Sequence, residues 1–568
     1  MKPKWQIAPP APQDHLARFP QLSPLIVQLL YNRGITTHQD VRDFLAGARP
    51  EGNPFQLKGM NKAVTRLRQA IRRGELVAIY GDFDADGVAA TALLVETLSA
   101  LGVNVKPYIP HRVDEGYGLN TDALRQLASQ GIRVVVTVDC GIRSIKEVIY
   151  ARKLGLDLII TDHHSVGQEV PPALAVINPK QPDCPYPFKD LAGVGVAFKL
   201  AQALLKANRQ VPVVKGEVGV NEEGLLDLVA LGTVTDLAPL LGENRSLVTG
   251  GLERLNNPQR RGIKALLTRA GLKPGGIDAT TIGFTLGPRL NAAGRIDNAM
   301  ISYNLLTASS DARADELASR LEELNQHRQQ LTVETFERAR EQVMTAVETE
   351  KLLFAMGEDF LAGIVGLVAH RLTEEFYRPS LVVELGPGES RGSARSIPEF
   401  NITAALDQCS DLLIRYGGHA AAAGFTVAND NLGALQKRLR ELAAEQLEGV
   451  ELTPTLLIDA EVELSEVDWA TQALLTQLEP CGYANPSPLL LSRRAIVRDA
   501  RTVGTDGSHL KLTLSDGRVV WDSIAFHQGQ LADQLPRHID VVYSLEVHEW
   551  NGEKRLQLNV KDLRPSAV

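Results

Sequence analysis

The stretch that decides the fold runs from Leu76 to Gly87 and reads Leu-Val-Ala-Ile-Tyr-Gly-Asp-Phe-Asp-Ala-Asp-Gly. Its apolar first half predicts a buried strand. Its second half carries three carboxylates at alternate positions, Asp82, Asp84 and Asp86, which an extended turn would point the same way. Such crowding of like charge is costly unless a cation neutralises it. The stretch therefore predicts a catalytic metal site at a strand end, with a solvated acidic turn as the alternative.

A calcium-binding loop does not fit these residues. A D-x-D-x-D-G loop of the EF-hand type needs Glu at its twelfth position, where this chain has Leu93. An EF-hand loop also follows a helix, whereas this stretch follows a predicted strand.

Three further acidic segments share this setting. They are Asp139 after Val134–Val138, the triplet Asp162-His163-His164 after Leu158–Thr161, and Asp236 after the apolar run Val229–Thr235. The first two follow predicted strands, and helical patterns such as 144–154 lie between the segments. The alternation predicts parallel βαβ units, whose ligands gather at the carboxyl ends of the strands.

In this order the motifs resemble those of the DHH phosphoesterase superfamily. Other segments extend the resemblance to RecJ-type exonucleases over nearly the whole chain. These are His111-Arg112-x-x-Glu115-Gly116-Tyr117-Gly118, the run from Gly287 to Arg295, Ser393-Ala394-Arg395-Ser396 and Gly417-Gly418-His419-Ala420. The DHH triplet alone is a weak signal, but the ordered set is specific.

The resemblance implies an α/β fold with a DHH parallel-sheet domain, a long connecting helix, a second α/β domain of DHHA1 type and a C-terminal OB-fold barrel. Residue patterns favour the same order, because 311–351 has helical spacing, and 509–514 and 541–547 alternate like strands. We expect a helical lead-in over 1–54, the DHH domain over 55–305, the connecting helix over 306–351, the substrate-binding domain over 352–452 and the nucleic-acid-binding barrel over 453–568.

Composition and charge describe an ordinary globular protein. Of the 568 residues, 44% are hydrophobic and 23% charged, and the length predicts two to four domains. We find no run long enough to span a bilayer and no zinc or disulfide spacing among the four cysteines. We therefore expect a cytoplasmic protein with no membrane association. The net charge of −8 argues mildly against nonspecific coating of duplex DNA, but not against a nuclease.

The predicted chemistry is phosphodiester hydrolysis by two divalent ions, Mn²⁺ or Mg²⁺, about 3.5–4 Å apart. An imidazole among carboxylates favours Mn²⁺. By residue type and resemblance, the metal ligands are Asp82, Asp84, Asp86, Asp139, His163 and Asp236. We expect Asp84 and Asp86 to share a side and Asp139 to bridge the ions. The resemblance implies that His164 faces the scissile phosphate. The alternative is that His164 orients a metal ligand, while Asp162 holds an imidazole tautomer.

Substrate binding falls to the remaining motifs. Arg295, Ser393 and Arg395 are candidates for gripping a terminal 5′-phosphate, and Arg289 is the alternative to Arg295. We expect Gly417, Gly418 and His419 to bring backbone N–H groups to a phosphate, with a tight turn as the alternative reading. Arg112 and Tyr117 would line the path of the strand. Gly193-x-Gly195 lacks the third glycine of a dinucleotide fingerprint, so we do not predict a nucleotide cofactor.

The resemblance implies a single-strand-specific 5′→3′ DNA exonuclease that releases 5′-mononucleotides in DNA repair and recombination. It also implies a monomer that works with single-strand-binding protein and a RecQ-type helicase. Two other functions stay open on sequence: a DHH phosphodiesterase acting on short oligoribonucleotides or cyclic dinucleotides, and a non-catalytic replication scaffold.

Overall fold

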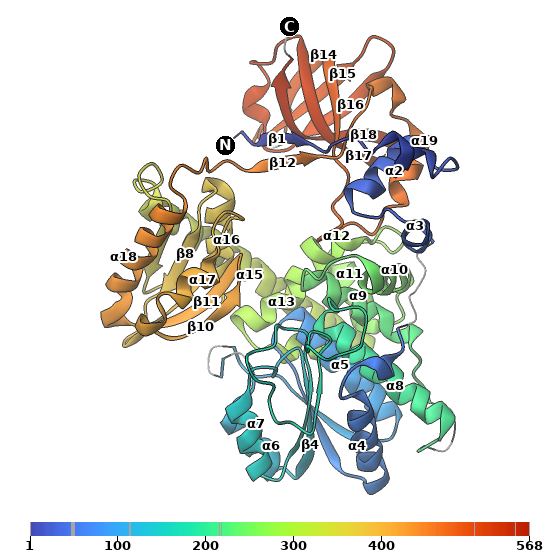
Figure 1. Cartoon of the computed structure of the whole chain (residues 1–568), viewed down its shortest axis with the longest axis vertical. Helices are drawn as coiled ribbons and strands as arrows, with labels where there is room; N and C mark the ends of the chain where they lie inside the picture. The colour runs from blue at the N-terminus through green and yellow to red at the C-terminus, as the bar shows by residue number, and fades with distance from the viewer. Residues whose placement is uncertain are drawn as a thin grey trace. The chain divides into compact units, whose positions relative to one another are not determined.

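The structure is a computed structural model that describes residues 2–46, 52–112, 115–116, 118–214, 216, 218–504, 506–550 and 553–566 (Figure 1). The chain forms two compact units. The central unit comprises Arg49–Glu451 with Gly482–Ala484, and the outer unit comprises Met1–Ala48, Leu452–Cys481 and Asn485–Val568.

A five-stranded parallel sheet organises the first part of the central unit. Its order is β3-β2-β4-β5-β6, with β2 Leu76–Tyr80, β3 Asn104–Tyr108, β4 Ile132–Val138, β5 Asp157–Thr161 and β6 Ala175–Ile177. One face packs against α4 (Met60–Arg73), α5 (Ala85–Ala100) and α8 (Gly193–Gln210). The other packs against α6 (Thr121–Ser129) and α7 (Ile145–Lys153). This is the predicted parallel α/β domain.

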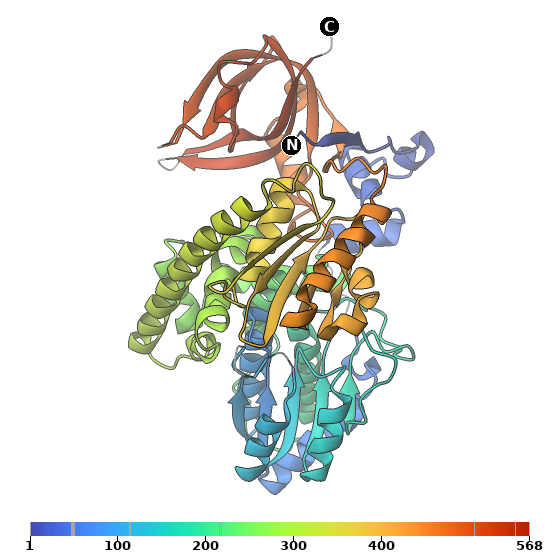
Figure 2. The same ribbon diagram turned by 90° about the vertical axis from the view of Figure 1, so that its left-hand side faces the viewer.

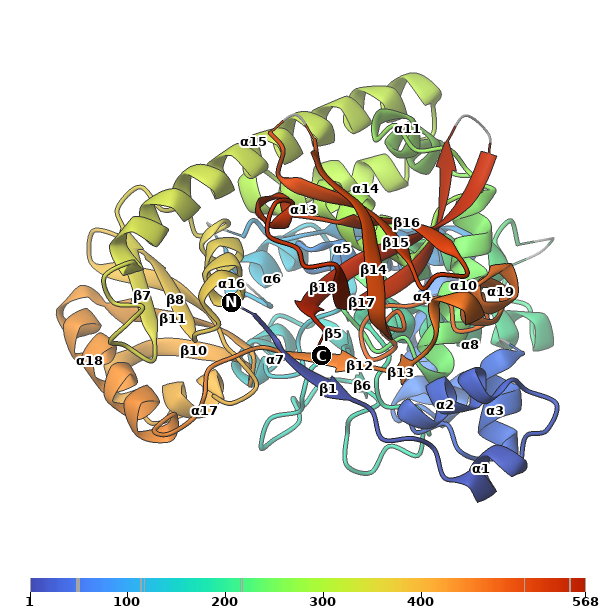
Figure 3. The ribbon, with the colours of Figure 1, turned by 90° about the horizontal axis from the view of Figure 1, so that it is seen from above.

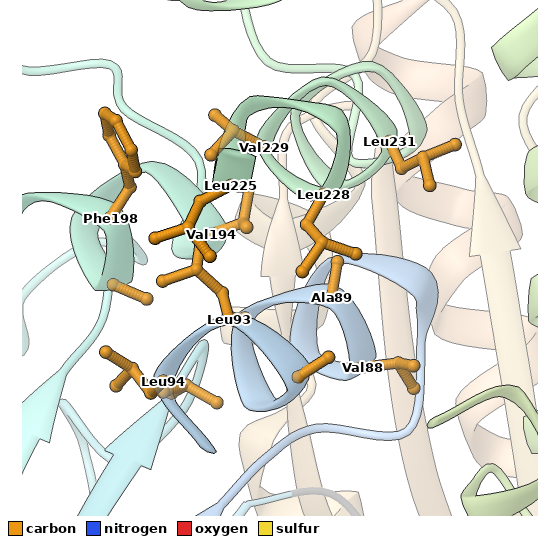
Figure 4. Close-up of a cluster of buried hydrophobic side chains, with 14 of the residues drawn as sticks. Val88, Ala89, Leu93, Leu94, Val194, Phe198, Leu225, Leu228, Val229 and Leu231 are labelled. Atoms are coloured by element: carbon orange, nitrogen blue, oxygen red, sulfur yellow. The ribbon is translucent and has the colours of Figure 1, made fainter. Parts of the chain in front are cut away.

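A layer of helices covers the same domain, with α9 (Leu226–Thr235) at its centre. The apolar run before Asp236 is therefore a helix, since apolar periodicity cannot separate a buried strand from a fully buried helix. Figure 4 shows Leu228 and Val229 of α9 among apolar side chains of α5 and α8. The rest of the layer is α10 Gly242–Asn256, α11 Arg261–Arg269, α12 Ala279–Thr281, the π-turn η3 Ile282–Leu286, α13 Gly287–Ile296 and α14 Met300–Leu306.

The predicted connecting helix is α15, Asp311–Val343, whose N-cap Ser310 accepts a hydrogen bond from the Arg313 N–H. It leads to a mixed sheet in the order β10-β11-β9-β8-β7 (Figure 2). The strands are β7 Leu353–Gly357, β8 Ser380–Glu384, β9 Glu389–Arg395, β10 Leu413–His419 and β11 Ala422–Ala428. The accompanying helices are α16 Val365–Phe376, α17 Ile402–Asp407 and α18 Asn429–Gln446.

The outer unit contains a closed barrel, because β14 pairs with both β15 and β17. Its strands are β14 Leu490–Val503, β15 His509–Ser515, β16 Val520–Ala525, β17 His538–Trp550 and β18 Glu553–Pro565. The predicted OB-type barrel is confirmed. The N-terminal residues fold with it: β1 (Lys4–Ile7) lies parallel beside β12 (Thr455–Ile458) (Figure 3). Helices α1 Gln13–Ala17, α2 Pro24–Asn32, α3 His38–Leu45 and α19 Trp469–Thr476 complete the unit.

Across the described part of the chain, no helix is both long and apolar enough to cross a membrane. All four cysteines are free thiols.

Candidate metal centre

The acidic stretch does not form one extended turn. Asp84 is the N-cap of α5, and its Oδ1 accepts hydrogen bonds from the N–H groups of Asp86 and Gly87 at 3.0 and 3.1 Å. Asp86 is therefore already in the first helical turn, whereas Asp82 precedes the helix. The reason is that carboxylates strongly favour N-cap positions. The side chains of Asp84 and Asp86 consequently belong to different groups of possible metal ligands.

Three overlapping groups of side chains bring their ligand atoms within 4.8 Å of one another. They are Asp82, Asp84 and Asp139; Asp86, His163 and Asp236; and Asp139, His163 and His164. Asp139 and His163 each occur in two of them, but only the Asp139 carboxylate has a second ligand oxygen, so Asp139 is the residue of the two that suits a bridging ligand. All six predicted ligands are thus brought together.

The spacing of these atoms suits a metal ion. His163 Nε2 lies 3.0 Å from Asp139 Oδ1 and 3.7 Å from Asp236 Oδ2. Two neighbouring ligands about 2.1 Å from an octahedral ion would be roughly 3 Å apart. Asp82 Oδ1 is buried without a hydrogen-bond partner among the described residues, although buried polar atoms normally have one. A divalent cation fits both observations.

The shifted pKa values of these side chains also suit a bound cation. Burial, and then the charges of neighbouring carboxylates, raise the pKa values of Asp82, Asp139 and Asp236 well above their usual range. The same causes raise the pKa of Asp86 to about 7. Burial followed by the charge of His164 lowers the pKa of His163 to about 3, so this imidazole is neutral, as a metal ligand must be.

Three glycines allow helices to approach the acidic side chains closely. A Cβ on Gly87 would lie 2.7 Å from the Asp82 Cβ, one on Gly193 would lie 2.6 Å from the Asp139 Cβ, and one on Gly232 would lie 2.5 Å from Asp86 Oδ1. No side chain larger than hydrogen fits at these points without displacing a predicted ligand.

The start of α8 also fixes Asp86, a role that the sequence analysis missed. The N–H groups of Gly193 and Val194 donate to the two Asp86 carboxylate oxygens at 2.7 and 2.8 Å. The sequence signal for this contact is the Gly193-x-Gly195 pair, which we consider above only as part of a nucleotide-binding loop. A helix N-terminus stabilises a carboxylate as well as a phosphate.

His164 is held in one orientation by Asp162. Its Nδ1 lies 2.8 Å from Asp162 Oδ1, and Asp162 also accepts backbone hydrogen bonds from Ile142, His163 and His164. Burial is the largest single effect and disfavours a charged imidazole, but the hydrogen bond to Asp162 and the charges of the nearby carboxylates together outweigh it and raise the pKa of His164. His164 can therefore carry a proton beside the acidic cluster. Because Nδ1 is hydrogen-bonded to Asp162, Nε2 is the ring nitrogen that could donate a proton to substrate.

The predicted phosphate-binding side chains separate into two environments. Arg289 donates to Glu322 at 2.7 Å and is already paired. Arg295 lies among like charges instead: burial, then the charges of Arg112, Arg328 and Arg395, lower its pKa to about 9. Such a cluster favours a bound anion. Within the part of the chain that the structure describes, Arg295 donates only to a backbone carbonyl, that of Gly363 at 3.1 Å, so of the two candidates it fits the predicted phosphate contact better.

The other members of this cluster come from three elements. Arg395 of β9 donates to Ser393 Oγ at 3.3 Å, so the predicted pair lies side by side. The Arg112 guanidinium lies 4.7 Å above the Phe83 ring, next to the acidic loop. Arg328 of α15 was missed, because sequence alone does not place the connecting helix; its Nε is buried with no hydrogen-bond partner among the described residues.

The Gly417-Gly418-His419 segment is part of a hairpin. Gly417 and Gly418 pair with Gly424 and Ala423 of β11, and a Cβ on Gly418 would lie 2.2 Å from the Ala422 carbonyl oxygen. Gly418 therefore lies in β10, before the turn at Ala420 and Ala421, where the opposite strand leaves no room for a side chain, whereas the packing around Gly417 leaves room for one. Burial and then the charge of His164 lower the pKa of His419. Tyr117 lies outside the described residues.

Comparisons with known families match all three domains in the predicted order. The models "DHH family, N-terminal domain", "DHHA1 domain" and "RecJ OB domain" match residues 76–233, 349–445 and 458–562.

Several relatives named single-stranded-DNA-specific exonuclease RecJ are similar over nearly the full chain. The Bacillus subtilis protein is 38% identical, covering 99% of this chain and 71% of the relative. The Escherichia coli protein is 35% identical, covering 97% of this chain and 98% of the relative.

Crystal structures of such proteins are also similar. RecJ from Thermus thermophilus in complex with Mn²⁺ has a TM-score of 0.84 and 30% identity, covering 100% of this chain and 80% of that one. The Mg²⁺ complex of the same protein has a TM-score of 0.78 and 28% identity, covering 100% and 79%. An exonuclease RecJ bound to manganese has a TM-score of 0.59 and 34% identity, covering 70% and 98%.

Proposed function

Because this chain belongs to the RecJ family of DHH proteins, we propose that it is a single-strand-specific 5′→3′ DNA exonuclease that depends on Mn²⁺ or Mg²⁺. The observation that carries the proposal is the position of Asp139, shared by two groups of possible ligands beside a cluster of arginines. A two-ion hydrolase needs the first feature, and recognition of a terminal phosphate needs the second.

The ligand groups suggest how two ions would be held. Asp82 and Asp84 would hold one ion, Asp86, His163 and Asp236 the other, and Asp139 both. When bound, the ions supply an activated water and offset charge on the phosphate in the transition state. Asp86 enters this arrangement already oriented by the two N–H groups at the start of α8.

His164 supplies the proton in this mechanism. Asp162 fixes its Nδ1 and favours the charged ring, so Nε2–H can donate to a phosphate oxygen and then to the leaving 3′-oxygen. The role rests on its position beside Asp139, 3.8 Å from Nδ1 to Oδ1.

The arginine cluster sets the length of the product. Arg295, Ser393 and Arg395 would hold the terminal 5′-phosphate, joined by Arg328. An end anchored at a fixed distance from the ions gives release of 5′-mononucleotides. Arg112, the member of the cluster that lies over the Phe83 ring, would contact the phosphate that is cleaved.

One assay tests the proposal. Single-stranded and duplex DNA, each labelled at the 5′ or the 3′ end, are incubated with the protein with and without Mn²⁺. We expect mononucleotides to appear first from the 5′ label of the single strand, only with metal. Faster cleavage of a dinucleotide than of a long strand would favour the short-oligonucleotide phosphodiesterase instead. Absence of bound metal and of any cleavage would favour a scaffold.

Family membership also supports narrower proposals about the protein's setting. We propose that it acts as a monomer in the cytoplasm, in DNA repair and recombination, on single strands delivered by single-strand-binding protein and a RecQ-type helicase. Sedimentation of the purified protein, and cleavage assays with each partner added, test these points separately.

A further inference from the structure

A single aromatic side chain stands out on the surface of the central unit. Phe284 is 82% exposed, the highest value among the large hydrophobic side chains of the described residues. It lies in the π-turn η3, Ile282–Leu286. Turns of this kind are rare, occur mostly as single turns within helices and are frequently found at functional sites.

The π-turn packs against the end of α9, directly before the predicted ligand Asp236. A Cβ on Gly287 would lie 2.4 Å from Thr235 Cγ2, and one on Gly283 would lie 3.9 Å from Val234 Cγ1. Phe284 is therefore carried on a turn that touches the helix end from which Asp236 projects.

A second exposed apolar residue lies at the same helix end. Leu237 follows Asp236, is 67% exposed and has φ +56°. Hydrogen bonds from the N–H groups of Leu237 and Ala238 to Val234 and Thr233 hold this left-handed conformation. Glycine or asparagine usually occupies such a position, so a leucine here keeps an apolar side chain in water at the cost of backbone strain.

Helix α13 connects this place with the two sites already described. Near the start of the helix, Gly287 contacts α9. In the middle, Asn291 Oδ1 accepts a hydrogen bond from the Ala85 N–H at 2.8 Å. Near the end, Gly294 lies against the Phe83 carbonyl, and Arg295 belongs to the arginine cluster. Gly287 and Arg295 are about 12 Å apart along the helix axis. Along α13, Gly287 is thus beside the exposed apolar residues, Asn291 is beside the acidic segment 82–86, and Arg295 is in the arginine cluster.

We propose that Phe284 and Leu237 form an apolar surface on which an unpaired base of the DNA strand stacks, on the 3′ side of the cleaved phosphate. The inference rests on the proposed function. A strand whose 5′-phosphate is at Arg295 and whose cleaved phosphate is at the metal loop continues toward the end of α9. Every base offers a face to an aromatic ring, so this contact tolerates any sequence but requires a base free of its complementary strand.

The test measures where along the strand the contact is made. Binding of 5′-phosphorylated oligothymidylates is followed by fluorescence anisotropy in Ca²⁺, under conditions in which the parent does not cleave. One oligonucleotide is intact, and each of the others lacks the base at one successive position. The proteins are the parent, Phe284→Ala, Phe284→Tyr and the control Ile149→Ala, which alters a residue of α7 that is 44% exposed.

We expect Phe284→Ala to bind the intact strand about 5- to 150-fold more weakly, the range measured for loss of one stacked base. Phe284→Tyr and Ile149→Ala should bind like the parent. Removing the base at one particular position should weaken the parent by a similar factor and leave Phe284→Ala unchanged, since that variant has no contact to lose.

The proposal is overturned if Phe284→Ala binds the intact strand like the parent, or if the variant and the parent lose affinity equally at every abasic position. Neither result touches the proposed exonuclease, which the parent's own metal-dependent cleavage of single strands tests independently.

Discussion

At the scale of single residues, Asp139 is the side chain on which the proposed chemistry depends most. We expect Asp139→Asn, which keeps the shape of the side chain, to leave less than about one hundredth of the parental turnover, because a bridging ligand positions both ions. The melting curve should still show a folded protein. Turnover above about a tenth of the parent's in excess Mn²⁺ would contradict the bridging role.

The raised carboxylate pKa values also predict how pH affects the metal-free protein. A carboxyl group with a folded pKa above its unfolded value of about 4 adds stability below that value and loses it as pH rises through the folded pKa. Asp86, with a folded pKa of about 7, and Asp139 both belong to this class. We therefore expect thermal stability without metal to fall as the pH rises from about 4 to about 7, by about 1.4 kcal/mol for each unit of pKa shift.

Asp139→Asn is the matched comparison for this pH effect. It removes one buried carboxylate, so its loss of stability across the same range should be smaller. His163, whose pKa is lowered to about 3, has the opposite effect, but it is present in both proteins. Added Mn²⁺ should abolish the loss in the parent. Identical melting profiles for parent and variant without metal would contradict the electrostatic account.

Phosphate recognition is a further residue-scale prediction, with Arg289 as its control. Arg395→Ala should lower the preference for 5′-phosphorylated over 5′-hydroxyl strands by about 1.5–3 kcal/mol, the value of a charge-assisted hydrogen bond. Arg289→Ala should change this preference little, because Arg289 is paired with Glu322. Competition between the two strands measures both variants, and an equal loss in both would place Arg289 at the phosphate.

At the scale of secondary-structure elements, sequence identified strand ends but not helix packing. Asp139 and Asp162 could be predicted because each follows an apolar strand, and parallel strands end at the same edge. The helical α9 could not, because a fully apolar run reads the same in a strand and in a buried helix. The capping role of Asp84, the anchoring of Asp86 by α8 and the presence of Arg328 in the arginine cluster all depend on contacts that sequence patterns do not report.

The start of α8 gives the prediction at this scale. Gly193→Ala adds a Cβ that would lie 2.6 Å from the Asp139 Cβ, so Asp139 must move. We expect Mn²⁺ affinity to fall about 10- to 100-fold, as it does when the support of a ligand is lost. Gly195→Ala is the control, because the nearest atom to its Cβ would belong to the Leu191 side chain, at 3.3 Å, and not to a proposed ligand. Manganese titration of both variants distinguishes displacement of Asp139 from a general effect of adding a methyl group to α8, because the second would weaken binding in both.

At the scale of the whole molecule, we expect the outer unit to supply a second surface that binds the DNA strand. It holds the barrel and the basic residues Arg493, Arg494, Arg498 and Arg501 of β14, and none of the proposed metal ligands. Residues 1–48 belong to this unit and their strand β1 pairs with β12, so removing the chain from residue 452 onward would leave them without this partner strand. The informative truncation is therefore residues 49–451.

We expect residues 49–451 to cleave short single strands and to bind long ones more weakly, with a shallower dependence on salt, because fewer phosphates are neutralised. Circular dichroism checks that the fragment is folded, and anisotropy titrations at several salt concentrations give the slope. Unchanged affinity and slope would assign the barrel another purpose.

The pairing of β1 with β12 has a consequence for biosynthesis. A ribosome makes Lys4 about 450 residues before Thr455, and at about 5–20 residues per second this delay is roughly 20 to 90 s. During that interval the central unit can fold as its own segments emerge, while the first strand has no edge to join. Its four-residue length and its charged Lys4 limit pairing with other chains during the wait. Completion of the outer unit therefore comes last, and only a full-length product can achieve it.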